Sequence, residues 1–303
     1  MTISLNTASG GMDAFQQMLD VIGNNIANEN TTAFKSSTAE FSDILSQTLT
    51  QGAAGSTSGI GGINPKQVGL GVQVAQIYKD FSQGSANTTN NPNDLMISGS
   101  GFFILSSTPT GSVTGSNIEY TRAGDFSVDS AGYLVAPNGM YLMGVPGTGS
   151  GVSATSSYYL NTTNSNFPST LEAINVNASG TSLSASGTAT SFSVGSDGQV
   201  SINGVSGTSY DIILAQFENP NGLIAVGNNM YNWAPNAGTG TLGMGVDSSA
   251  FQNTNLTQGM LESSNVDLTK EMSNMIVAQT GYEANSKVIN TVNSMNQFMM
   301  QQV

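Results

Sequence analysis

The sequence contains no cysteine and no histidine, and these two absences exclude most side-chain chemistry. Disulfide bonds, thiol catalysis, serine–histidine triads and zinc sites built on His or Cys are all impossible. Charge is also scarce, because only 8% of the residues are charged, against about a quarter in typical soluble domains. The surface must therefore consist largely of Ser, Thr, Asn, Gln and Gly, which favours close contact between copies because little charge repulsion opposes it.

Basic residues are the scarcest charged type, with six Lys and Arg against 19 Asp and Glu. This balance argues against nucleic acid or an anionic membrane as a partner, since both attract clustered cations. No apolar run approaches the roughly 18 residues of a membrane-spanning helix. The N-terminal segment lacks the basic region of a secretory signal. We therefore expect no membrane insertion. Cytosolic residence and export by a route that needs no cleaved signal peptide are equally consistent with these features.

Few segments invite a catalytic interpretation. Asp125 and Asp129 are more consistent with a hairpin turn than with a glycosidase-like carboxylate pair or a calcium loop. The glycines of 144–151 lack the Lys and the helix of a phosphate-binding loop, so a turn or linker is favoured. Trp233, the single tryptophan, is expected to be a partly buried packing residue. We expect no enzyme activity, no cofactor and no metal site.

The N-terminal segment carries apolar residues at alternating spacings of three and four, which predicts an amphipathic helix over about residues 7–28. The residues of this seam are Leu5, Ala8, Met12, Phe15, Leu19, Ile22 and Ile26. A second seam predicts a helix from near Ser264, with Asp267 completing a capping box, almost to the C-terminus. Its apolar residues are Met272, Met275, Ala278, Tyr282, Ile289, Val292 and Met299.

The two predicted helices are weak when taken alone. Asn285 and Asn296 interrupt the second seam, and Gly281 costs about 1 kcal/mol relative to Ala within a helix. We infer that both ends are disordered in the free monomer and become helical when a partner covers them. Phe15 and Tyr282 are expected to stay exposed until neighbouring copies bury them. The methionines of the last helix fit either ordinary core filling or an interface that slides between alternative packings.

The middle of the chain shows strand-like alternation and frequent turn residues. Val68, Leu70, Val72 and Val74 alternate, and Ile212–Ala215 is typical of a central strand covered on both faces. The expected fold class is α+β, with terminal helices pairing as a coiled-coil domain around a β-rich middle of antiparallel strands. The expected parts are the coiled coil at 1–35 and 260–303, an extended linker at 36–70, and the β-rich domain at 71–259, with a loop or insertion near 145–190.

Several ordered motifs resemble the bacterial flagellar rod and hook protein family. Gly23–Asn28 is followed by Asn30–Lys35, and within them the family signature falls on Asn24, Asn25, Ala27, Asn28, Phe34 and Lys35. Further matches follow along the chain at Gln67–Val72, Asp80–Gly84, Asp94–Phe103, Tyr120–Phe126, Leu261–Glu271 and Met275–Gln279. The resemblance covers nearly the whole sequence.

The resemblance implies a structural subunit of a helical tube, with the terminal helices lining a channel. Motifs at Ser37–Asp43 and Asn265–Thr269 favour the flexible hook, a joint that transmits motor torque to the filament. The short chain leaves the distal rod, a rigid drive shaft, as the alternative. Implied partners are further copies, rod and hook–filament junction proteins, the hook cap and the flagellar type III export apparatus; the implied location is the extracellular flagellum. A secreted glycan hydrolase and an adhesin of independent β-domains remain as competing classes.

Overall fold

The fold is described from a computed structural model, which covers residues 2–52, 54, 61–109, 117–148, 158–159, 171–176, 192–202, 208–244 and 254–301. The chain forms two compact units. The helical unit comprises residues 1–29, 36–80 and 266–303, and the β unit comprises residues 30–35 and 81–265. Each unit is discontinuous in sequence, so the chain crosses from one to the other several times.

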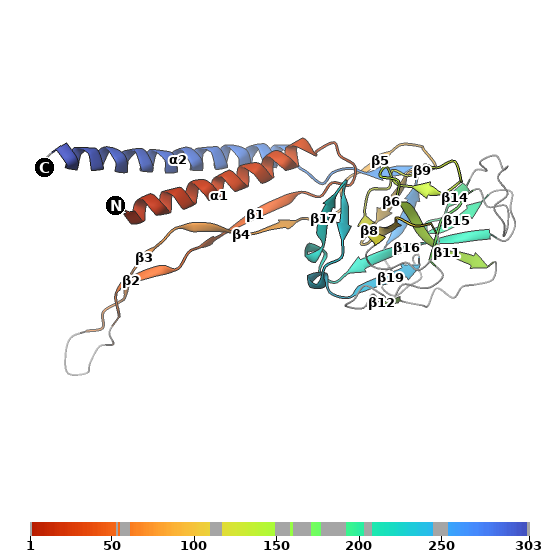
Figure 1. The fold of residues 1–303 in the computed structure, drawn as a ribbon, viewed down its shortest axis with the longest axis horizontal. Helices are drawn as coiled ribbons and strands as arrows, with labels where there is room; N and C mark the ends of the chain where they lie inside the picture. The colour runs from red at the N-terminus through yellow and green to blue at the C-terminus, as the bar shows by residue number, and fades with distance from the viewer. Residues whose placement is uncertain are drawn as a thin grey trace. The chain divides into compact units, whose positions relative to one another are not determined.

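The helical unit contains the two long helices, α1 (Thr2–Ala27) and α2 (Leu268–Gln301). They run antiparallel side by side, with both chain termini at the same end of the pair (Figure 1). The helix start differs from the expected capping box at Ser264. Asp267 caps α2 instead, because its Oδ1 accepts hydrogen bonds from the backbone N–H groups of Thr269 at 2.9 Å and Lys270 at 3.2 Å.

A long two-stranded ribbon completes the helical unit. It is built from β1 (Ser37–Asp43), β2 (Ser46–Thr50), β3 (Lys66–Gly69) and β4 (Val72–Lys79). β1 pairs antiparallel with β4, and β2 with β3. The described residues of the expected linker, 36–52, 54 and 61–70, therefore include paired strands, although the Gly, Ser and Thr content of 36–70 is typical of flexible chain.

The β unit is assembled from short antiparallel strands. Within the described residues, 13 strands join one sheet, and β16 lies at its centre, where it pairs with β7, β11, β15 and β19. The strands are β5 (Ala86–Thr88), β6 (Leu95–Ser98), β7 (Phe102–Ser106), β8 (Ile118–Thr121), β9 (Ser127–Val128), β10 (Leu134–Val135), β11 (Tyr141–Thr148), β12 (Tyr158–Tyr159), β13 (Glu172–Ala173), β14 (Phe192–Val194), β15 (Gln199–Ile202), β16 (Thr208–Phe217), β17 (Ile224–Gly227), β18 (Met230–Asn232), β19 (Gly240–Met244), β20 (Asn255–Gln258) and β21 (Met260–Glu262).

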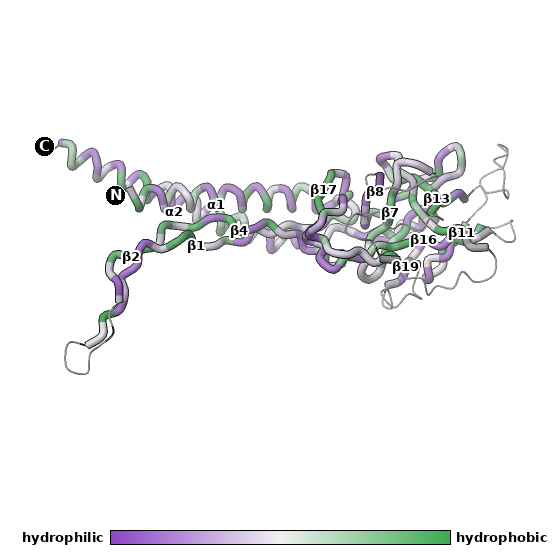
Figure 2. Tube along the Cα trace, turned by 60° about the horizontal axis from the view of Figure 1, so that its bottom comes forward, coloured by the Kyte–Doolittle hydropathy of each residue, from purple (hydrophilic) through white to green (hydrophobic). Residues whose placement is uncertain are grey.

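Two apolar cores lie on opposite faces of the central strands. Along β7, Phe103 and Leu105 enter one core, whereas Phe102 and Ile104 enter the other. The alternation of side chains along a strand sends successive residues to opposite faces, so both faces of β7 are dry. β16 repeats the pattern, because Ile212 and Leu214 enter the first core and Ile213 and Ala215 enter the second. Figure 2 shows hydrophobic (green) positions in the region of β7 and β16. The expectation that Ile212–Ala215 forms a central strand covered on both faces is confirmed.

The expected α+β fold is confirmed, with paired terminal helices and antiparallel strands between them. The division of the chain differs from the expected ranges, because 71–80 lies in the helical unit and 260–265 in the β unit. The loop expected near 145–190 falls mostly outside the described residues. Among the described helices, none is both long enough and apolar enough to cross a membrane.

Candidate functional site

The helices of the helical unit meet through small residues. Ala8, Gly11 and Ala14 form a buried line along α1, and Ala278 is fully buried on α2. A Cβ placed on Gly281 would lie 2.5 Å from Cζ of Phe15. Only a residue without a side chain leaves room for the Phe15 ring at that point, which explains a glycine in the middle of a long helix.

The predicted seam of α1 is only partly buried in the isolated chain. Ile22 is buried; Met12, Phe15, Leu19 and Ile26 are half-buried, and Leu5 is exposed. Phe15 differs from the expectation that it stays exposed until neighbouring copies cover it. Its ring packs on Gly281 and lies 5.9 Å, between centroids, from the ring of Phe41 on β1. The ribbon covers this side of α1, and the sequence pattern alone gave no sign of that cover.

The predicted seam of α2 shows the same division. Val292 is buried, Met275 and Ile289 are half-buried, and Met272, Tyr282 and Met299 are exposed. Other large apolar residues of α2 lie off the seam and are equally or more exposed. This exposed apolar set consists of Ile276, Val277, Val288, Met295, Phe298 and Met300. A heptad pattern selects one face of a helix, whereas the adjacent residues Ile276 and Val277 of α2 lie about 100° apart around the helix axis and are both apolar.

The signature asparagines hold the end of α1 in place. Asn25 is buried and makes a two-way contact with the backbone of Ser37. Its Nδ2 donates to the Ser37 carbonyl at 2.8 Å, and its Oδ1 accepts from the Ser37 N–H at 2.9 Å. Asn28 Nδ2 donates to the carbonyl of Asn24 at 2.9 Å, while Asn24 and Ala27 are exposed. This part of the signature therefore fixes the exit of the chain from α1 into β1.

The outer ribbon, which consists of β2, β3 and the flanking residues Leu45 and Ile63, is exposed throughout. Every residue of β2 and β3 is exposed. Leu45 is 85% exposed and Leu49 is 61% exposed, and Ile63 and Val68 are exposed as well. Large apolar side chains on an isolated two-stranded ribbon are unusual in a monomer, because such a ribbon is only marginally stable without cover. Together with the exposed apolar set of α2, this segment forms the candidate assembly surface of the helical unit.

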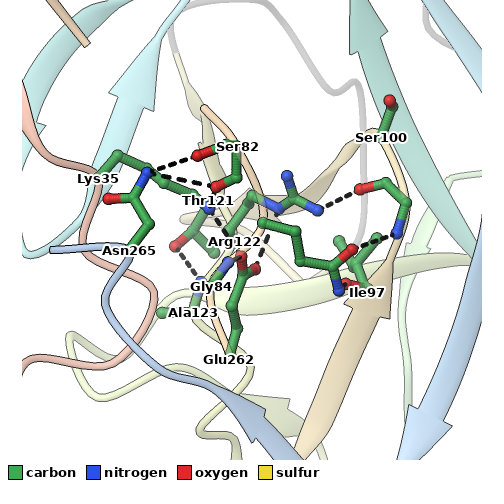
Figure 3. A network of polar contacts seen from close by, with 12 residues as sticks. Lys35, Ser82, Gly84, Ile97, Ser100, Thr121, Arg122, Ala123, Glu262 and Asn265 are labelled. Carbon is green, nitrogen blue, oxygen red and sulfur yellow. Dashed lines mark hydrogen bonds and ion pairs between the residues drawn. The ribbon is translucent and has the colours of Figure 1, made fainter. Parts of the chain in front are cut away.

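The remaining signature residues lie in the β unit, where Lys35 is the centre of a buried polar network (Figure 3). Its Nζ donates to the carbonyl of Ser82 at 2.6 Å and to Oε1 of Glu262 at 2.7 Å. The same Glu262 oxygen accepts from the N–H of Gly84 at 2.8 Å. The side chains of Lys35 and Glu262 are 0% and 1% exposed. A buried charge of either sign is stable only when it is paired and hydrogen-bonded in this way.

A second cation shares the Glu262 carboxylate. Arg122 is buried, with its Nε 3.3 Å from Oε2 of Glu262, and a guanidinium N–H group donates to the carbonyl of Gly99. Burial lowers the pKa of Arg122, and the charge of Glu262 opposes that change. Two buried cations thus depend on one buried anion, and backbone carbonyls accept hydrogen bonds from both.

The network ties together segments that lie far apart in sequence. Ala33 N–H donates to the Glu262 carbonyl at 2.8 Å, and Asn265 N–H donates to the carbonyl of Phe34 at 3.3 Å. Phe34 is buried, and Ala33 adopts a positive φ of 55°. The segments 30–35, 82–84 and 262–265, each beside a crossing between the two units, are therefore held to one another inside the β unit. Sequence reasoning singled out Phe34 and Lys35 but missed Arg122 and Glu262, for which only the resemblance motifs offered a signal.

The candidate catalytic segments are structural where they are described. Asp129 Oδ1 accepts hydrogen bonds from the N–H groups of Ala131 and Tyr133, each at 2.9 Å, which confirms the hairpin turn. The part of 144–151 that the structure describes belongs to β11. Trp233 is half-buried against an apolar core and donates to the carbonyl of Gly238 at 3.2 Å, which confirms a packing role. Among the described residues, no group of three or more Asp, Glu, His or Cys side chains is placed to hold a metal ion.

Three family models match the chain in order. They are described as "Flagella basal body rod protein" over residues 5–35, "Flagellar hook protein FlgE/F/G D1 domain" over 96–202, and "Flagellar basal body rod FlgEFG protein C-terminal" over 257–302. The matches at the two ends fall mainly on the two helices, and the middle match falls within the β unit.

Similarity to individual proteins extends over the whole chain. The flagellar basal-body rod protein FlgG of Bacillus subtilis is 38% identical, over 96% of this chain and 95% of that protein. FlgG of Caulobacter vibrioides is 35% identical, over 97% of each. The flagellar hook protein FlgE of Borreliella burgdorferi is 46% identical, but over only 48% of this chain and 31% of that protein. The chain belongs to the family of flagellar basal-body rod and hook proteins.

Proposed function

We propose that the chain is a structural subunit of the flagellar distal rod, where copies polymerise into a straight, rigid tube. One observation carries this proposal. The similarity to rod proteins runs from end to end of both chains, whereas the similarity to hook proteins covers less than half of this chain and about a third of theirs. The distal rod, the alternative interpretation from sequence, is therefore favoured over the hook.

The candidate assembly surface supports a polymer. The exposed apolar set of α2 and the outer ribbon leave large side chains such as Phe298 and Leu45 in water in the isolated chain. Burying one such side chain against a neighbour contributes about 1.5–3 kcal/mol. We infer that α1, α2 and the ribbon of each copy pack against further copies.

A rod assignment also changes the inferred partners. Under the distal-rod proposal, the expected partners are neighbouring rod proteins, in place of the hook cap and the hook–filament junction proteins that the hook interpretation implied. The expected location is the basal body of the flagellum. Passage of an unfolded chain through the flagellar export apparatus remains part of this proposal. The weak intrinsic stability of both helices supports it, because a chain with loosely formed ends is easier to unfold for export.

Complementation separates the rod from the hook. The chain is expressed in two strains, one lacking its FlgG-type rod protein and one lacking its hook protein. We expect motility to return only in the first, and electron micrographs of assembled protein to show straight tubes. Restoration of the hook-deficient strain alone, with curved tubes, would overturn the distal-rod assignment.

A matched pair of variants controls the complementation. Phe298→Asp places a charge on the exposed apolar set, whereas Gln297→Asp places the same charge on a neighbouring exposed polar position of α2. The first is expected to abolish rescue and the second to preserve it. Equal loss in both would assign the failure to the added charge rather than to a packing surface.

A further inference from the structure

A pocket of about 390 Å³ opens on the β unit. Its walls combine apolar surface from Ala136, Pro137 and Met230 with amide groups from Asn138 and Asn229. Asp125 is its single charged residue. An apolar wall that leads to one carboxylate matches the side chain of lysine, which has an aliphatic stem and a cationic end.

Asp125 lacks a cation within the β unit. The basic residues of this unit are Lys35 and Arg122, and both are buried and share Glu262. Asp94 is adjacent to Asp125 across an antiparallel bridge, and its like charge adds to the effect of burial in raising the pKa of the Asp125 carboxyl. The carboxylate is therefore held in surroundings that disfavour its charge, and an incoming cation relieves that penalty.

The complementary cation lies on the ribbon. Lys66 is the first residue of β3 and is exposed, as are the nearby apolar residues Ile63 and Val68. The sequence contains no acidic residue between Asp43 and Asp80, and Lys66 takes part in neither salt bridge found among the described residues. The other ribbon cation, Lys79, is half-buried and donates to Ser37 Oγ at 3.5 Å. On α2, Lys287 follows Glu283 by one helical turn, which gives it an acid on its own helix.

We propose that the pocket around Asp125 receives Lys66 of a second copy, so that the outer ribbon of one subunit docks on the β unit of another. This inference rests on the proposed polymerisation and adds the residues of one contact to it. Charge complementarity selects the occupant: the pocket offers an unneutralised carboxylate, and the ribbon offers an unneutralised ammonium group. Docking also covers ribbon residues such as Ile63 and Val68, whose exposure in one copy is otherwise unexplained.

Charge exchange tests the pair in the full-length chain. Lys66→Asp and Asp125→Lys are each expected to raise the protein concentration needed for polymerisation about tenfold, the effect of losing one partly buried ion pair. The variant carrying both changes restores the pair in reverse and is expected to return to within about threefold of the parent chain. Failure of the double variant to recover would overturn the proposal and indicate another occupant, such as a small cation or a different basic protein.

Matched charge changes provide the control. Lys287→Glu and Glu218→Lys alter exposed residues by the same amount of charge outside the pocket and the outer ribbon. They are expected to change the polymerisation threshold less than threefold. Thermal unfolding of each monomer verifies that the variants fold. If a control variant raised the polymerisation threshold as much as Lys66→Asp does, net charge would explain the effect, and the proposed pairing of Lys66 with Asp125 would be overturned.

Disulfide cross-linking locates the contact directly. Because the sequence contains no native cysteine, only the introduced cysteines can form the bond. Lys66→Cys and Asp125→Cys are placed on separate copies, which are mixed, assembled and oxidised. We expect a dimer in which mass spectrometry identifies a bond between positions 66 and 125. A polymer without this bond would overturn the docking proposal and leave the distal-rod proposal standing, whereas the absence of any polymer from the parent chain would overturn both.

Discussion

Phe15 of α1 lies directly over Gly281 of α2, with no space for a side chain between them. A Cβ on Gly281 would come within 2.5 Å of Cζ of Phe15, and the ring of Phe41 lies 5.9 Å from that of Phe15 between centroids. The Phe15 ring thus packs against both a helix backbone and the ribbon. This contact joins the N-terminal helix, the C-terminal helix and β1 at one point.

Gly281→Ala is expected to lower the free energy of unfolding when the Phe15 ring is present and to raise it when the ring is absent. In the parent chain the new methyl group displaces the ring and lowers the free energy of unfolding by about 1 kcal/mol. In a Phe15→Ala background the clash is gone, and the higher helix propensity of Ala raises the free energy of unfolding by about 1 kcal/mol. Urea unfolding followed by far-ultraviolet circular dichroism measures both. The same sign in both backgrounds would contradict the contact.

Gly23 provides the matched control for this experiment. It lies in α1, is exposed, and a Cβ placed on it would have no neighbour within 4 Å. Gly23→Ala is therefore expected to stabilise the chain by about 0.5–1 kcal/mol in either background. A loss of stability at this position would show that helix propensity does not govern these sites.

Glu262→Gln is expected to destabilise the β unit more than Lys35→Met. Removing the carboxylate charge leaves two buried cations, Lys35 and Arg122, without an anion, whereas removing the ammonium group leaves one cation and one anion paired. Breaking a buried pair from one side costs about 3–5 kcal/mol, and the loss at Glu262 should lie at the upper end. Chemical denaturation of the purified chain gives the ranking. Glu218→Gln, at an exposed position, should change stability by less than about 0.5 kcal/mol.

Asp125→Asn is expected to change the dependence of stability on pH. Burial, followed by the charge of Asp94, raises the pKa of the Asp125 carboxyl above its ordinary value of 3.8. The folded chain therefore binds this proton more readily than the unfolded chain. The free energy of unfolding falls as pH rises from 3.8 to the raised value.

Asp125→Asn has no carboxyl group at this position, so its free energy of unfolding should not fall in this pH range. The variant should therefore be more stable than the parent at neutral pH, and the difference should vanish below the ordinary carboxyl pKa of 3.8. Unfolding free energies measured across the acid range test the sign. Asp211→Asn offers an independent second case, because burial and the charge of Asp197 raise the pKa of Asp211 as well. Identical slopes in parent and variants would contradict the assignment.

The sequence was sufficient to predict the helices and their pairing, because a heptad pattern follows directly from the geometry of an α-helix. It was insufficient for the ribbon. Strands such as β2 and β3 show no buried face in a single chain, and period-two alternation is informative only where one face is dry. The contact of Phe41 with Phe15 depends on the fold, which brings together segments that a sequence pattern describes separately.

The buried network was predictable only in part. Lys35 attracted notice through the signature motif, but a lysine followed by serines is normally exposed. Its partner Glu262 is 227 residues away in sequence, and no local periodicity reports a pairing at that distance. Likewise, the role of Gly281 was visible only as a cost to the helix, since the ring that requires it belongs to the opposite end of the chain.

Ile276→Asp is expected to prevent polymerisation while leaving the monomer intact. Ile276 is 62% exposed on α2, so an aspartate there should change monomer stability by less than about 0.5 kcal/mol. In a polymer that buries this side chain, the same change removes about 1.5–3 kcal/mol of apolar burial and adds the cost of desolvating a charge. The concentration required for assembly, measured by sedimentation, should therefore rise by well over tenfold. Gln279→Asp adds the same charge at an exposed polar position of α2 and should assemble like the parent. Normal assembly of Ile276→Asp would remove this part of α2 from the packing surface and leave the outer ribbon as the remaining candidate.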